Sequence, residues 1–170
     1  CFGPTKEAAQ LEGSKEFMKV FLEKYSIPSA EYKAFTNAKE AINYIKKKGC
    51  PIVIKADGLA AGKGVTIAKN MNEAIEAIHD SMNSQIFGDA GKKVVIEEFL
   101  SGEEASFIVM TDGKTALPFA SSQDHKARDD GDLGPNTGGM GAYSPAPIVD
   151  KEIHEKIMNT VIYPTLAGLE

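Results

Sequence analysis

Apolar residues recur at helical spacing in four segments of the chain, and a residue suited to capping a helix precedes each of them. The spacing predicts helices over residues 14–25, over 37–49, from 70 or 72 through 82, and from 150 onward. The expected apolar stripe of the first helix consists of Phe17, Val20, Phe21 and Leu22. Asn37 and Glu40 have the spacing of a capping box, which favours a helix start there.

Short apolar runs between these segments predict strands over 32–35, 51–55, 65–68, 94–96, 105–110 and 115–120. The sequence Thr-Asp-Gly-Lys at 111–114 is typical of a hairpin turn joining the last two. Residues 121–147 are rich in Gly, Pro, Asp and Asn and lack periodicity, so we expect a long loop. The mixture predicts a mixed α/β or α+β chain in which helices pack on largely antiparallel sheet.

Composition narrows the function classes. The chain has 170 residues, 42% apolar and 25% charged, which is ordinary for a globular protein and excludes a disordered, collagen-like or coiled-coil chain. The net charge of −5 argues against a general nucleic-acid-binding surface but allows a local basic pocket. We expect no membrane span, because no apolar run approaches about 20 residues. Two cysteines without zinc-site spacing favour a reducing, cytoplasmic environment.

A glycine-rich loop is the first candidate for chemistry. It contains Gly58, Gly62, Lys63 and Gly64, and Lys55 ends the strand before it. Glycines let backbone N–H groups approach anionic oxygens, and a lysine supplies a positive charge. The spacing is neither that of a Walker A loop nor that of a Rossmann fingerprint. With strands on both sides, the loop is typical either of a flap over a triphosphate or of a flexible hairpin.

Residues 97–100 form a second candidate site where an apolar strand ends. Backbone groups there could meet an adenine edge, and Glu104 could accept hydrogen bonds from ribose; a solvated acidic turn is the alternative. Lys15, close to a predicted helix start, is slightly misplaced for the helix dipole and is a further candidate; a solvated surface lysine is the alternative.

Residues 123–141 contain the third group of polar residues and glycines. The sequence Gln-Asp-His-Lys at 123–126 is followed by Gly-Pro-Asn-Thr-Gly-Gly-Met-Gly at 134–141, which suits a polar, phosphorylated or carboxylate substrate. The aspartates do not have EF-hand spacing, so we do not expect a calcium loop. His125 could serve as a base, as a phosphate donor or as a structural residue.

Several of these stretches together resemble the glycinamide ribonucleotide synthetase (phosphoribosylamine–glycine ligase) family of the ATP-grasp superfamily. The stretches are FGP at 2–4, LEGSK at 11–15, IVIKADGLAAGKGV at 52–65, VVIEEFLSGEEASF at 94–107, QDHK at 123–126 and GPNTGGMGAYSPAP at 134–147. The last stretch is the most specific to this family, whereas the glycine loop and EEFL are typical of ATP-grasp proteins in general.

The resemblance implies a fold in which two α+β lobes clamp ATP. It also implies a reaction in which ATP, glycine and 5-phosphoribosylamine give glycinamide ribonucleotide, ADP and phosphate in purine synthesis. Glycine and 5-phosphoribosylamine would be the substrates, with ATP and Mg²⁺ as cofactors and with no nucleic-acid or membrane partner. The oligomeric state is left open by the sequence.

The resemblance assigns roles by position. The ATP-binding residues would be Lys15, Lys55, Gly58, Gly62, Lys63, Gly64, Glu97, Glu98, Phe99, Leu100 and Glu104. Within this group the lysines would meet the phosphates, 97–100 would frame adenine and Glu104 would hold ribose. The catalytic residues would be Lys63, Asp124, His125 and Lys126. The substrate loop would consist of Asn136, Thr137, Gly138, Gly139, Met140 and Gly141.

The same resemblance predicts how the chain is organised. Residues 1–24 would be a lead-in segment, 25–98 a small lid lobe and 99–170 the first part of the larger lobe. The chain would be a central fragment, inactive alone, with the magnesium ligands outside it. Ala127 stands where the family usually has Arg, which questions a phosphate role for Arg128. Two alternatives are another ATP-grasp ligase, such as a biotin-carboxylase-like enzyme, and a non-catalytic nucleotide-binding module.

Overall fold

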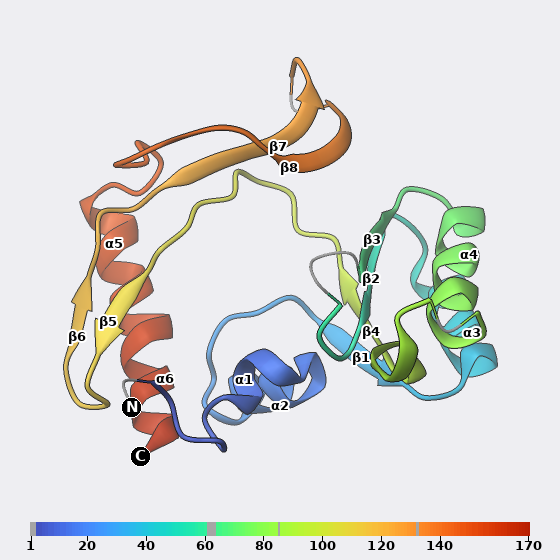
Figure 1. Cartoon of the computed structure of the whole chain (residues 1–170), viewed down its shortest axis with the longest axis horizontal. Coiled ribbons are helices and arrows are strands. Elements are labelled where there is room, and N and C mark those ends of the chain that lie inside the picture. Colours follow the sequence, from blue (N-terminus) through green and yellow to red (C-terminus); the bar gives the residue numbers. More distant parts are fainter. Residues whose placement is uncertain (1–2, 61–63, 85, 132) are drawn as a thin grey trace. The chain divides into compact units, whose positions relative to one another are not determined.

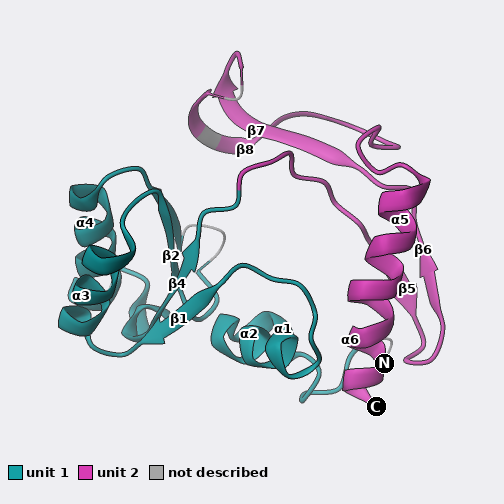
Figure 2. Cartoon of the chain, turned by 180° about the vertical axis from the view of Figure 1, so that it is seen from behind, with its two compact units in different colours: residues 1–100 teal, residues 101–170 magenta. Residues whose placement is uncertain are grey.

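The computed structural model describes residues 3–60, 64–84, 86–131 and 133–170. The chain divides into two compact units, residues 1–100 and residues 101–170 (Figure 2). The finer division into a lead-in segment, a lid lobe and a partial larger lobe stays a prediction.

A four-stranded sheet forms the centre of the first unit. Its strands are β1 (Tyr32–Phe35), β2 (Ile52–Ala56), β3 (Val65–Ala68) and β4 (Val94–Glu98), in the order β1-β4-β2-β3, and all neighbours are antiparallel. The register sets Lys55 opposite Val95 and Val53 opposite Glu97. Because side chains alternate across a strand, Lys55 and Glu97 lie on the same face of the sheet.

Helices α3 (Ala38–Lys48) and α4 (Met71–Met82) cover the other face (Figure 1). Ile45 of α3 and Ile78 of α4 are fully buried, together with Ile54 and Ile96 from the sheet. Both helices begin directly after a predicted capping residue. The side chain of Asn37 accepts backbone N–H groups of α3, and that of Asn70 accepts one of α4. The core of this unit therefore lies between the two helices and the sheet.

Helices α1 (Gln10–Gly13) and α2 (Lys15–Lys24) precede the sheet, and a short 3₁₀ helix, η1 (Gly88–Lys92), precedes β4. Ser14 caps α2 as predicted, accepting the N–H of Phe17. The predicted apolar stripe of α2 is wrong in part, since Phe17 and Val20 are exposed and Lys19 is buried. Lys19 can occupy that position because its ammonium finds oxygen acceptors there, which hydropathy does not reveal.

The second unit contains the predicted hairpin, β5 (Val109–Thr111) and β6 (Ala116–Pro118), with shorter strands than expected. An isolated bridge between Ser106 and Ser122 replaces the start of the expected 105–110 strand. The C-terminal helical segment begins at the cap Asp150 and comprises α5 (Lys151–Ile157), a π-helical turn η2 (Met158–Ile162) and α6 (Tyr163–Leu169).

The long loop predicted over 121–147 is wrong. This region contains two paired strands, β7 (Gln123–Asp129) and β8 (Leu133–Tyr143). Backbone pairing holds this hairpin although β8 is rich in glycine, which disfavours strands. Most described side chains along it are at least partly exposed, so the sequence shows no alternation of buried and exposed residues. Among the described residues, no helix is both long and apolar enough to cross a membrane.

Candidate functional site

Two lysines share one carboxylate oxygen in the first unit. The Oε2 atom of Glu97 lies 3.0 Å from Nζ of Lys19 and 3.0 Å from Nζ of Lys55. Glu97 is the one acidic residue of β4 turned away from the core of this unit, toward α2. Its side chain is 6% exposed and that of Lys19 is 3% exposed, whereas that of Lys55 is 25% exposed. Two of the three members of the cluster are therefore buried, and Lys55 reaches solvent.

The second oxygen of Glu97 is buried and unpaired. Oε1 has no hydrogen-bond partner among the described residues, and almost none of its surface is accessible. A buried carboxylate oxygen without a donor is unfavourable, so such an atom requires an explanation. A ligand with an N–H donor would supply the missing hydrogen bond if the atoms that cover Oε1 moved aside.

Lys15 starts α2 and reaches the beginning of the glycine-rich loop. Its Nζ donates to the backbone oxygens of Ala56, at 2.7 Å, and of Gly58, at 3.1 Å. The sequence singled out Lys15 as a phosphate ligand, and the structure places its charge at this loop. In the structure the ammonium is engaged by carbonyl groups of the loop.

Asp57 fixes α2 to the loop and was not among the residues selected from the sequence. Its carboxylate accepts the N–H of Glu16 at 2.7 Å and the hydroxyl of Ser14 at 3.1 Å. Lys93 approaches the same carboxylate at 3.9 Å and forms an ion pair with Glu16, which raises the pKa of Lys93. The sequence shows only that an acidic residue, Asp57, lies two positions after Lys55. Its contact with Ser14 depends on the fold, because the two residues are far apart in the sequence.

The two described ends of the glycine-rich loop are tightly packed. A Cβ atom on Gly58 would lie 2.9 Å from Cβ of Ala90, and one on Gly64 would lie 2.7 Å from Cβ of Ala60. Both separations are too short for carbon atoms, so glycine is required there for packing. Gly62 and Lys63, expected in the same loop, lie outside the described residues.

The other residues expected to frame adenine lie at the end of strand β4 and just after it. The carboxylate of Glu98 accepts the N–H of Glu31 at 2.8 Å, and the N–H of Glu98 donates to the carbonyl of Glu31. The side chain of Glu98 is thus engaged beside β1, while Phe99 and Leu100 are exposed. This leaves the apolar side chains of 99 and 100 for contact with a flat ligand.

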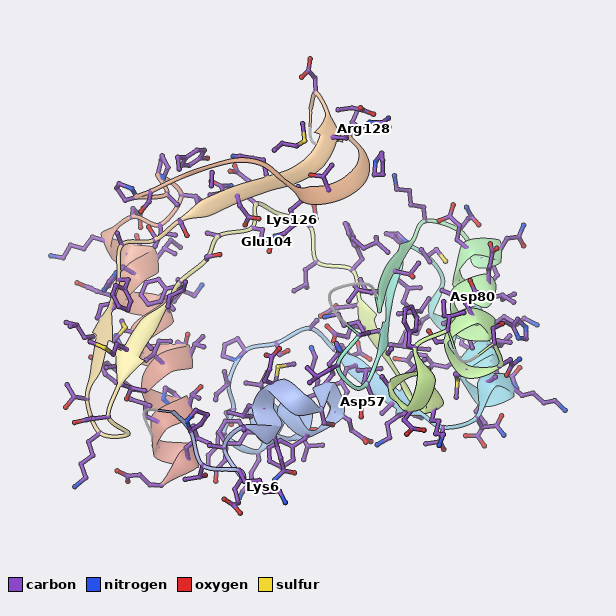
Figure 3. The ribbon with its side chains drawn as sticks, in the orientation of Figure 1. Lys6, Asp57, Asp80, Glu104, Lys126 and Arg128 are labelled. Carbon is purple, nitrogen blue, oxygen red and sulfur yellow. The ribbon has the colours of Figure 1, made fainter. Side chains whose placement is uncertain are left out.

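Three charged residues meet in the second unit. Nζ of Lys126 lies 2.8 Å from Asp124 and 3.7 Å from Glu104, and Figure 3 shows Glu104 and Lys126 close together. The hydrogen bond with Lys126 lowers the pKa of Asp124, and the same bond raises the pKa of Lys126. The sequence assigned Glu104 to ribose and Lys126 to catalysis, and the structure brings the two together.

The glycine-rich strand β8 bulges opposite Lys126. Lys126 alone lies between the paired residues His125 and Ala127, whereas residues 137–140 lie between their partners Gly141 and Asn136. The bulge thus contains Thr137, Gly138, Gly139 and Met140 of the expected substrate loop. Within it the N–H of Gly139 donates to the hydroxyl of Thr137 at 3.0 Å. Extra residues in one strand change the direction of its backbone N–H and C=O groups, and in this hairpin they do so opposite Lys126.

His125 lies beside Tyr143, with ring centroids 5.3 Å apart. The hydroxyl of Tyr143 donates to the buried Gln123 at 2.6 Å, and Gln123 in turn donates to Glu103 at 3.2 Å. Gln123 and Tyr143 were not selected from the sequence, which offered no sign that they pair. They join the first residue of β7 to the last residue of β8, next to the expected catalytic residues.

Two further expectations concern Arg128 and metal ions. The guanidinium of Arg128 binds the neighbouring carboxylate of Asp129, at 2.8 Å from Nε, and whether Arg128 meets a phosphate stays open. In the part of the chain that the structure describes, no group of three or more His, Cys, Asp or Glu side chains is arranged to hold a metal ion.

Comparison with known proteins identifies the family. The model of the phosphoribosylglycinamide synthetase ATP-grasp (A) domain matches residues 13–170. The chain belongs to this family. A phosphoribosylamine–glycine ligase of Pseudomonas syringae pv. tomato is 61% identical over 169 residues, which are 99% of this chain and 39% of the relative. The family expected from the sequence is thereby confirmed.

Solved structures confirm the ATP-grasp fold of this family member. The phosphoribosylamine–glycine ligase of Thermotoga maritima is 40% identical, with a TM-score of 0.80 over 98% of this chain and 42% of that structure. A biotin carboxylase–beta-gamma-ATP complex from Campylobacter jejuni has a TM-score of 0.78 over 98% of this chain and 36% of that one, but only 18% identity, so it supports the fold alone. The chain spans about two fifths of the length of its ligase relatives.

Proposed function

We propose that the protein to which this chain belongs joins glycine to 5-phosphoribosylamine at the expense of ATP, giving glycinamide ribonucleotide, ADP and phosphate in purine synthesis. The family match over residues 13–170 and the ligase relatives support this assignment. Because the chain covers 39% of that relative, the complete reaction draws on residues that are not in this sequence.

The reaction would proceed in two steps. An oxygen of the glycine carboxylate attacks the γ-phosphorus of ATP, the bond to the β-phosphate oxygen breaks, and ADP leaves. The amine of 5-phosphoribosylamine then attacks the carbonyl carbon of glycyl phosphate, loses a proton and displaces phosphate. Phosphoryl transfer depends mostly on positioning and on stabilising negative charge, and lysines and backbone N–H groups are suited to both tasks.

The unpaired Oε1 of Glu97 is the observation that carries the nucleotide assignment. The 6-amino group of adenine is a donor that would satisfy this buried acceptor. Phe99 and Leu100 follow Glu97 with exposed apolar side chains, which are suited to contact the base. We assign the adenine subsite to residues 97–100 on these grounds.

The phosphates would be held from the opposite end of β2. Lys55 shares the face of Glu97 and is partly exposed, and Lys15 lies at the start of the glycine-rich loop. We propose that both turn their ammonium groups toward the triphosphate, with Lys63 and the loop glycines as further ligands. The ribose role of Glu104 is part of the same proposal, and it requires Glu104 to exchange its contact with Lys126 for the sugar hydroxyls.

The substrate side is proposed to consist of Asp124, His125, Lys126 and residues 136–141. Lys126 carries a positive charge next to the glycine-rich bulge, which suits a carboxylate or phosphate group. On the family resemblance we place the ligands of Mg²⁺ outside this chain, and we derive no step through the metal. The cytoplasmic location expected from the two cysteines also remains a proposal.

Measuring ADP formation tests this function. A full-length ligase that contains this chain is supplied with ATP, and glycine and 5-phosphoribosylamine are omitted in turn. We expect ADP release only with glycine present and full turnover only with both substrates. ADP release that responds to another carboxylate but not to glycine would show a different ATP-grasp ligase. No ADP release with any acid would indicate a non-catalytic nucleotide-binding protein.

A further inference from the structure

Lys19 is a buried cation to which the proposed reaction gives no role. Its Nζ lies 2.6 Å from Oγ of Ser29, 3.1 Å from the carbonyl oxygen of Ala30 and 3.0 Å from Oε2 of Glu97. An ammonium has three N–H donors, and these three acceptors engage all of them. The buried ammonium of Lys19 is therefore fully satisfied and held in one position.

Lys55 contacts the same oxygen of Glu97, but its side chain is partly exposed to solvent. Its side chain is 25% exposed, compared with 3% for Lys19, and it stands beside the loop proposed to receive phosphates. When Lys55 turns toward a phosphate, Oε2 of Glu97 loses one of its two cations. A buried carboxylate without any counter-ion is strongly unfavourable, and Lys19 remains in place to prevent this.

We propose that Lys19 is a positioning residue that holds the carboxylate of Glu97 in place, so that Oε1 can accept a hydrogen bond from the 6-amino group of the nucleobase once the atoms covering it move and Lys55 engages the phosphates. This inference rests on the proposed binding of ATP. It assigns to Lys19 a part in base selectivity, because an amino group at C6 donates to Oε1 whereas a carbonyl group at C6 cannot.

The test compares two purine nucleotides in a full-length ligase that contains this chain. Inosine triphosphate has an oxygen where ATP has the 6-amino group, so the ratio of kcat/KM for ATP to kcat/KM for inosine triphosphate reports on the Glu97 contact. Losing a hydrogen bond to a charged group changes affinity by about tenfold, so we expect Lys19→Met to lower this ratio by about that factor, mainly through the KM for ATP.

Three further variants make the test specific. Lys24→Met removes an exposed lysine of the same helix and should leave the ratio unchanged. Glu97→Gln should lower the ratio by itself, and Lys19→Met added to it should lower the ratio no further, because Lys19 acts through Glu97. Ser29→Ala removes one acceptor of Lys19 and is a milder change in case Lys19→Met does not fold. It should lower the ratio in the same direction by a smaller factor.

The outcomes separate this inference from the proposed function. A substitution that only destabilises the fold reduces the rate with both nucleotides equally and leaves the ratio unchanged, which would overturn the inference. An unchanged ratio in Ser29→Ala, where Lys19→Met is not obtained folded, would overturn it too. Equal, additive effects of Lys19→Met in the presence and absence of Glu97→Gln would do the same. If the unsubstituted ligase itself forms no ADP with glycine, the proposed function fails independently of Lys19.

Discussion

The carboxylate of Asp57 accepts the backbone N–H of Glu16 at 2.7 Å, which joins the residue after strand β2 to the first turn of helix α2. Ser14, the cap of α2, also donates its hydroxyl to Asp57, at 3.1 Å. A carboxylate at a helix N-terminus is favourable because it meets unpaired N–H groups and the positive end of the helix dipole. Asp57 therefore sets the position of Lys15 relative to the loop that Lys15 contacts.

We predict that Asp57→Ala lowers the free energy of unfolding by about 2 kcal/mol, since it removes a capping interaction and hydrogen bonds to a charged group. Urea denaturation followed by circular dichroism measures the change. Asp80→Ala is the matched control because Asp80 is exposed on α4, and Figure 3 shows both side chains. Equal losses in the two variants would contradict a specific role for Asp57.

Local sequence rules predicted most of the first unit. Ser14 and Asn37 cap helices where the sequence placed them, as does Asp150 in the second unit, and Asn70 is the cap of the two candidates 70 and 72; a cap depends on residues within one helical turn. The strands of the first unit were also predicted. The signal is strongest in β2 and β4, which are β-branched runs with buried residues, whereas β1 has no β-branched residue and β3 is mostly exposed. These local patterns suffice to recognise the elements, although not the order of strands in the sheet.

The interactions that sequence reasoning missed are non-local. From the sequence Lys19 is expected to be a surface residue, and only the fold places it against Glu97 of β4. Asp57 is expected to be a loop residue, and only the fold places it against α2. The β7–β8 hairpin was missed because it is stabilised by backbone pairing and has little buried apolar surface. Strand propensity does not predict such a hairpin, because the glycines and the proline of β8 lower the strand propensity of this segment.

The packing of Gly58 and Gly64 predicts a loss of stability when a methyl group is added. We expect Gly58→Ala and Gly64→Ala each to cost about 1–3 kcal/mol, the usual range for overpacking, because the added Cβ would meet Ala90 or Ala60 at less than 3 Å. Thermal unfolding measures the effect. Gly13→Ala is the control, as its Cβ would meet nothing within 4 Å. Unfolding temperatures like that of the control would show that the loop ends can relax.

The exposure of Lys55 beside Glu97 predicts a specific defect in nucleotide use. In a full-length ligase that contains this chain, we expect Lys55→Met to raise the KM for ATP about tenfold or more, the usual effect of removing a charged hydrogen bond, with little change in the KM for 5-phosphoribosylamine. Steady-state ADP formation measures both constants. Lys33→Met, which removes an exposed lysine from strand β1, is the control. A similar rise in both constants would contradict the assignment of Lys55 to the phosphates.

The ion pair of Asp124 and Lys126 predicts the pH range in which the proposed substrate side keeps its charges. The hydrogen bond from Lys126 lowers the pKa of Asp124, and the bond to Asp124 raises the pKa of Lys126. The interaction therefore contributes fully above the ordinary aspartate pKa of about 3.9, and it is lost as the pH falls through the lowered value. At the basic end, Lys126 keeps its proton above the ordinary lysine pKa of about 10.4.

Nuclear magnetic resonance of the side-chain carboxyl carbon of Asp124 measures this directly. We expect its titration midpoint to lie below about 3.9 in the unsubstituted protein and to rise toward that value in Lys126→Met. Glu104→Gln removes the more distant acid, 3.7 Å from Lys126, and leaves the closer pair intact, so the midpoint should stay low in this variant. A midpoint that does not move in Lys126→Met would show that another group stabilises the Asp124 carboxylate, and Lys126 would then be available for an anionic substrate without first leaving Asp124.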